Sequence, residues 1–187
     1  MAALKNLGNG DSLNKKNVLI LAVIFSALIF ISALMQTTFL SLFGKVPALT
    51  FSICCAIGFI MGGRAGAVSG VFAGICADYL GSTGISFSPI FYMLCAYLCG
   101  ELVGWFLSKN LPSFLVYSLI LGLFKEIVTL IYCGMISESF DLWKITVTLL
   151  IPEYFAYLVC VIPAYGAVFG INKLFKGKKK RDKLSFR

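Results

Sequence analysis

The sequence contains no histidine, and charged residues make up only 13% of its 187 residues, against about 25% in ordinary soluble domains. Without histidine the chain lacks the usual general base and the commonest metal ligand. It has no HExxH motif and no CxxC motif, so a zinc site has no sequence support. This composition excludes a disordered chain and an ordinary soluble domain, and it offers no cofactor or metal site.

Apolar residues are abundant instead. They make up 59% of the chain, and the mean hydropathy is +0.93. Such values indicate an integral membrane protein built almost entirely of bilayer-spanning segments. The seven cysteines lie inside apolar runs. We interpret them as small buried hydrophobic residues rather than redox or metal-binding groups.

Six apolar runs predict six transmembrane helices joined by short loops, an all-α integral membrane protein. They cover residues 18–36, 47–61, 65–80, 89–107, 113–134 and 145–175. The first run is longer than the apolar part of a signal peptide, so we interpret it as an uncleaved span. Pro152 and Pro163 predict a kink in the sixth helix. The predicted organisation is a flexible lead-in over 1–17, one membrane domain over 18–175 and a basic tail over 176–187.

The distribution of basic residues predicts that both termini are cytoplasmic. Lysine and arginine prefer the cytoplasmic loops of membrane proteins. From Lys173 onward the chain carries eight basic residues and one acid, a local charge of +7. A basic segment directly after a span is typical of contact with anionic lipid, and no pattern for nucleic-acid binding accompanies it. The segments assigned to the cytoplasm also contain basic residues (Lys5, Lys15, Lys16, Arg64 and Lys109), whereas the outside loops contain only Lys45 and Lys144.

Glycines recur every four residues in the third predicted helix. Gly66, Gly70 and Gly74 are followed at the same spacing by Asp78, so all four share one helix face. Gly81 and Gly84 follow, where the chain is expected to turn. Small residues at this spacing let a second helix approach closely. This face predicts either packing against another helix of the same chain or docking of another protein, including a second copy of the chain.

Ionisable residues inside the spans predict an intramembrane polar cluster. A carboxylate facing lipid costs at least ~2.5–3.5 kcal/mol, so Asp78, Glu126 and Glu153 are expected to gather with Lys125 in the outer half of the membrane. Glu101 belongs to the same set of intramembrane acids but is expected nearer the inside. Adjacent helix residues do not face each other, so Lys125 is expected to pair with Asp78 or Glu153 rather than Glu126.

The polar cluster does not indicate catalysis. The sequence pairs no serine or cysteine nucleophile with a base, and it has no histidine. We therefore expect a protein that is not an enzyme and has no catalytic residues. Two uses remain open for the cluster: a small-molecule pocket, or a socket for charged residues on a partner's helix.

The segment 66–84, GAVSGVFAGICADYLGSTG, followed by PIFYMLCAYLCG at 89–100, resembles the rod shape-determining protein MreD family. That family shows glycines leading to Gly-x-x-x-Asp, a glycine-containing turn and a helix with an aromatic residue near its start. Gly74 and Asp78 match the first element, and Tyr92 the last. Chain length, short loops and a proline in the last helix also fit.

This resemblance implies a non-enzymatic scaffold of the bacterial cell-elongation machinery, located in the cytoplasmic membrane. Its expected partners are an MreC-like single-span protein, MreB and elongation-type peptidoglycan synthases. Under this interpretation Gly66, Gly70, Gly74 and Asp78 serve packing or docking.

The chain is also similar in size and helix number to substrate-binding subunits of energy-coupling-factor vitamin transporters, and a shared fold is expected. Those subunits hold a vitamin in an outer-half pocket, which the polar cluster would also suit. Their first helix often carries an Ala-x-x-x-Ala face. Here the corresponding pairs are Ala22 with Ser26 and Ala27 with Ile31, which favours the shape protein over the transporter subunit.

Overall fold

The computed structural model describes residues 15–38, 48–81, 88–106, 110–136, 146 and 151–185, and no strand occurs within these ranges. The all-helical class is therefore confirmed for this part of the chain. The helices are α2 (Lys15–Thr38), α3 (Leu49–Met61), α4 (Gly63–Gly81), α5 (Ser88–Phe106), α6 (Leu111–Ile136) and α8 (Ile151–Ser185).

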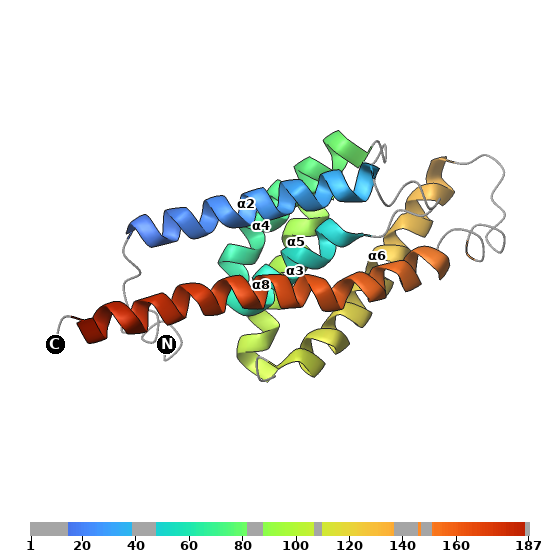
Figure 1. Ribbon diagram of the computed structural model, residues 1–187. Coiled ribbons are helices and arrows are strands. Elements are labelled where there is room, and N and C mark those ends of the chain that lie inside the picture. The colour runs from blue at the N-terminus through green and yellow to red at the C-terminus, as the bar shows by residue number, and fades with distance from the viewer. Residues whose placement is uncertain are drawn as a thin grey trace.

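Helix α3 forms the centre of the molecule. Every residue from Thr50 to Ile60 is buried, because α3 contacts α2, α4, α5, α6 and α8. The long helices α2 and α8 run antiparallel on either side of it (Figure 1). The beginning of α2 and the end of α8 consequently lie on the same side of the molecule.

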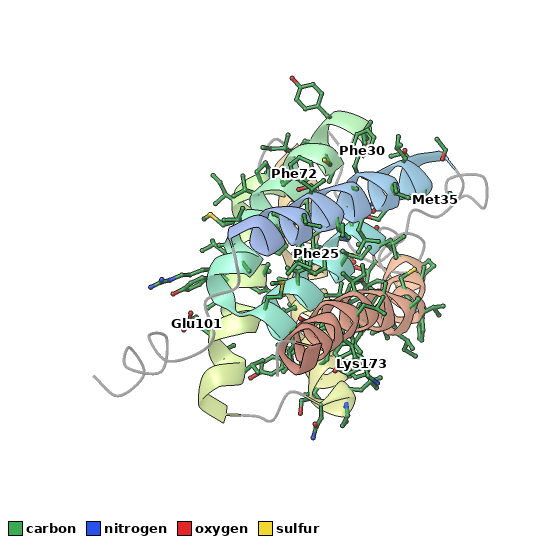
Figure 2. All side chains as sticks on the ribbon, turned by 60° about the vertical axis from the view of Figure 1, so that its left-hand side comes forward. Phe25, Phe30, Met35, Phe72, Glu101 and Lys173 are labelled. Atoms are coloured by element: carbon green, nitrogen blue, oxygen red, sulfur yellow. The ribbon has the colours of Figure 1, made fainter. Side chains whose placement is uncertain are left out.

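Three helices are long and apolar enough to cross a membrane. They contain the segments Ile20–Thr38, Leu111–Ile131 and Ile151–Leu174. The apolar segments Leu49–Met61 and Ser88–Val103 are shorter. Phe30, Met35 and Phe72 project outward from α2 and α4 (Figure 2), and 37–50% of each side chain is exposed. An apolar surface of this kind suits lipid rather than water, as expected of a membrane protein.

The glycine face of α4 packs directly on α5. A Cβ atom added at Gly70 would lie 2.5 Å from the carbonyl oxygen of Tyr92, and Gly66 and Gly74 meet the α5 backbone equally closely. Helix α5 of the same chain covers this face. The geometry is therefore that of helix packing within the chain, the first of the two alternatives that the glycine spacing leaves open. Gly81 is the last residue of α4, and Gly84 lies outside the described residues.

A tight turn at Gly62 connects α3 to α4. Its φ is 105° and its ψ 165°, a conformation that is essentially confined to glycine and costs other residues on the order of 1–3 kcal/mol. Its N–H donates to the Gly58 carbonyl at 2.8 Å and closes the last turn of α3. The two helices can therefore pack side by side without an intervening loop.

Helix α8 is described from Ile151, with Pro152 in its first described turn and Pro163 inside the helix. Residues 147–150 lie outside the described residues, and the predicted kink at Pro152 falls at this boundary. The helix also continues to Ser185, through most of the predicted basic tail, and α2 begins at Lys15, within the predicted lead-in.

Candidate functional site

An ionic triad joins α6 to α8. The Nζ atom of Lys125 lies 2.7 Å from Oε1 of Glu153 and 3.1 Å from Oε1 of Glu126. The Lys125 and Glu126 side chains are 13% and 9% exposed, and Glu153 is 24% exposed. With all three groups ionised, the triad carries a net charge of −1. Its lysine is shared between two carboxylates in a largely buried place.

The contact between Lys125 and Glu126 corrects an expectation. Adjacent residues leave a helix about 100° apart, which disfavours a direct contact between short side chains. The lysine side chain is long enough to bend along the helix surface and place its ammonium group away from its own Cα. Lys125 therefore contacts its neighbour Glu126 and, across the helix interface, Glu153.

Two tyrosines hold α8 against α6 beside the triad. The Tyr157 hydroxyl donates to the Ser118 carbonyl oxygen at 3.0 Å, and the Tyr154 hydroxyl donates to that of Leu119 at 3.2 Å. Both rings lie over Gly122, where a Cβ atom would meet them at 3.0 Å or less. The close approach of α6 and α8, and hence the position of Glu153 near Lys125, depends on this missing side chain.

An apolar groove of about 420 Å³ lies next to the triad and is open on one side. Leu123, Ile127, Ile151 and Phe155 line it, and each side chain is at least 45% exposed. The remaining lining residues are Glu126, Leu130, Thr146 and Tyr154. The groove therefore opens onto an apolar surface rather than into the core of the chain.

Glu126 is the polar group that distinguishes this groove from an ordinary lipid-facing surface. The residue is 7% exposed. Its Oε1 contacts Lys125, but its Oε2 is buried and has no hydrogen-bond partner in the described part of the chain. Buried polar atoms without partners are rare and costly. The site can therefore accept a hydrogen bond, or neutralise one positive charge, at a defined atom.

Asp78 and Glu101 lie outside the triad. No ion pair joins Asp78 to Lys125 among the described residues, and its Oδ1 atom is buried without a partner there. The buried Tyr92 hydroxyl is within electrostatic range of both Asp78 and Glu153, so Asp78 belongs to the same end of the bundle. Glu101 is an exposed residue, nine positions beyond Tyr92 on α5, or about 14 Å along the helix.

Glu101 does not belong to the polar cluster, which corrects its assignment to that set. Its carboxylate lies instead beside the first residue of α4, where a Cβ atom at Gly63 would meet its Oε1 at 2.8 Å. A helix N-terminus stabilises a nearby negative charge. Figure 2 shows Glu101 at the edge of the bundle, away from the centre.

The role of Asp78 can be tested by two substitutions. Asp78→Asn keeps the shape and one carbonyl oxygen without a buried charge, so we expect a loss of stability below about 1 kcal/mol. Asp78→Leu removes all polar atoms and enlarges the side chain near the tight packing of α4 on α5, so we expect a larger loss, about 1–3 kcal/mol. Thermal unfolding of the purified protein in detergent compares them. Equal losses would show that side-chain shape and hydrogen bonding at Asp78 are irrelevant.

Within the described residues, no three acidic or cysteine side chains are placed to hold a metal ion. Gly122, Tyr154 and Tyr157 are features of the site that sequence reasoning missed. The signal was present: Gly122 lies three positions before Lys125, and Tyr157 lies four positions after Glu153, so each pair shares a helix face.

Comparison of the chain with protein-family models, with curated proteins and with solved structures gave no match.

Proposed function

We propose that this protein is a non-enzymatic membrane scaffold that binds another membrane protein through the α6–α8 groove. The observation that carries the proposal is the buried Oε2 atom of Glu126, which has no partner in the described part of the chain and lies at the wall of an open apolar groove. Inside a bilayer, apolar contact alone gives little drive for helices to associate, and polar groups provide specific attraction. A groove of this composition suits a partner in the membrane.

The proposed topology has six helices within the bilayer and both termini in the cytoplasm. Three helices have the length and hydropathy to span, and α3, α4 and α5 complete the bundle as shorter crossings. The positions of the basic residues support this orientation. The continuous α8 would carry the basic residues after Lys173 beyond the membrane surface, where anionic lipid headgroups can bind them.

The particular system we propose is the cell-elongation machinery of a bacterium, with the protein in the cytoplasmic membrane. The resemblance of residues 66–100 to the MreD family supports this assignment. The proposed partner at the groove is an MreC-like single-span protein, with MreB and elongation-type peptidoglycan synthases in the same assembly. The packing of Gly66, Gly70 and Gly74 on α5 assigns the glycine part of that motif to the fold of the scaffold rather than to the partner.

A second candidate is the substrate-binding subunit of an energy-coupling-factor vitamin transporter. The groove volume of about 420 Å³ lies within the roughly 300–1,000 Å³ common for small-molecule sites. However, such sites are concave and bury most of the ligand, whereas this groove is open, and Leu123, Ile127, Ile151 and Phe155 in its lining are exposed. The geometry therefore favours a helix over a vitamin.

A pull-down from native membranes tests the proposed function. The full chain is extracted in mild detergent and the co-purifying proteins are identified by mass spectrometry. We expect a single-span MreC-like protein or an elongation-type synthase, at least fivefold depleted with the groove-filling variant Ile127→Trp. Val23→Trp, at a 62% exposed position on α2, is the matched control and should retain the partner. Recovery of a coupling subunit with paired ATPases would overturn the scaffold proposal.

A further inference from the structure

The groove next to Glu126 has the chemistry to recognise one kind of side chain. We infer that it docks a transmembrane helix of a partner that carries a single lysine or arginine one to two turns from one end of its span, with the cation placed on Glu126 Oε2. The inference rests on the proposed scaffold function and adds the chemistry of the partner.

Charge complementarity is the first argument. The ammonium group of Lys125 is already shared between Oε1 of Glu126 and Oε1 of Glu153. With both carboxylates ionised, one cation against two leaves one negative charge, and Oε2 of Glu126 is the buried triad atom that has no partner among the described residues. An ionised carboxylate oxygen left unpaired in a bilayer is strongly unfavourable. A single positive charge supplied from outside the chain would neutralise the site.

The shape of the site is the second argument. Leu123, Ile127 and Leu130 on α6 follow one another at intervals of four and three residues, so they form a continuous apolar stripe along one helix face. Ile151 and Phe155 form the facing stripe on α8. Two apolar stripes on adjacent helices leave a valley that fits the side chains of a third helix.

The site lies near one end of the spanning segments. Glu126 is five residues before the end of the segment Leu111–Ile131, or about 8 Å along the axis. Glu153 lies in the first turn of the segment Ile151–Leu174. A partner helix can place a basic side chain at this level, one to two turns inside its own span, and the counter-charge at the groove would offset part of its insertion cost. The two apolar stripes favour a helix over a lipid headgroup at this level.

A designed peptide pair tests this inference with the full chain. The probe is a 24-residue Leu/Ala transmembrane peptide with uncharged flanking residues and one lysine six residues from one end, and its control has leucine at that position. The chain and the labelled peptide are reconstituted into phosphatidylcholine vesicles, and association is measured by energy transfer. We expect the lysine peptide to bind about tenfold more tightly than the leucine peptide, which corresponds to about 1.4 kcal/mol.

Two variants test whether the preference for the lysine peptide depends on Glu126. Glu126→Gln should remove it, so that both peptides bind alike, whereas Glu101→Gln should retain it because Glu101 lies about 14 Å away along α5 from the triad end. If Glu126→Gln reduces the amount of folded protein, a photo-crosslinker decides instead. Placed at Ile127 it should capture the lysine peptide, and placed at Val23 on α2 it should not. Equal binding of both peptides by the wild type, or a preference that survives Glu126→Gln, would overturn the inference.

A third outcome would identify a lipid occupant. If adding phosphatidylethanolamine to the vesicles displaces the lysine peptide, the groove binds a lipid amine and the inference fails.

Failure of this test is distinguishable from failure of the proposed function. A pull-down that recovers an MreC-like protein while the peptides bind equally would place the partner elsewhere. Selective peptide binding without elongation proteins in the pull-down would support the site and refute the assigned system.

Discussion

Replacing Gly70 by leucine is expected to prevent the native packing of α4 on α5. A Cβ atom at this position would lie 2.5 Å from the Tyr92 carbonyl oxygen and 2.7 Å from the Met93 Cα. Both neighbours belong to the backbone of α5, which cannot move aside as a flexible side chain can. We expect a loss of at least about 4 kcal/mol, the range of severe core disruption. Fluorescence-detected size-exclusion chromatography and thermal unfolding in mild detergent measure it.

The matched control for this prediction is Gly166→Leu in α8. A Cβ atom at Gly166 would have no neighbour within 4 Å, and both substitutions add the same apolar side chain. Gly166→Leu should therefore behave as the wild type, and both variants should remain in the membrane fraction after carbonate extraction. A Gly70→Leu protein as stable as the Gly166→Leu protein would contradict the α4–α5 packing.

Replacing Lys125 by methionine is expected to have the second large effect. Met fills the space of the lysine stem but leaves the carboxylates of Glu126 and Glu153 without their shared cation. Removing one partner of a buried ion pair typically costs about 3–5 kcal/mol. For a chain of this size that corresponds to a decrease in Tm on the order of 10 °C, measurable by thermal unfolding in detergent.

Charge removal and charge reversal test the cause of this loss. The triple variant Lys125→Met/Glu126→Gln/Glu153→Gln removes all three charges and should recover most of the lost stability. The exchange of Lys125→Glu with Glu153→Lys should rescue expression relative to Lys125→Glu alone. Lys173→Met, at an exposed position on α8, is the control for loss of any lysine. Full stability of Lys125→Met would refute a structural role for the triad.

The helical class and the apolar character of the protein follow from one-dimensional information. A spanning helix needs about 20 apolar residues in sequence, and hydropathy alone finds such runs in α2, α6 and α8. The common face of Gly66, Gly70 and Gly74 likewise follows from a repeat of four residues. These inferences require no knowledge of what lies next to a helix.

The errors in the prediction have specific physical causes. Lys125 was expected to avoid Glu126 because helix periodicity places Cα and Cβ atoms, not the end of a long flexible side chain. Glu101 was grouped with the other acids because residue type contains no information on distance between helices.

Composition and helix periodicity establish that the chain is helical and apolar, that α4 has a face of small residues, and that a few charges need partners in an apolar surrounding. The identity of those partners depends on how the helices pack. Packing places α5 on the glycine face and brings Glu153 to Lys125 beside the contact of Tyr157 with Gly122. It also leaves Oε2 of Glu126 at an open groove, without a partner among the described residues. The reason is that periodicity defines which residues share a face, whereas the neighbour of that face, and its height along the helix, depend on how all the helices pack together.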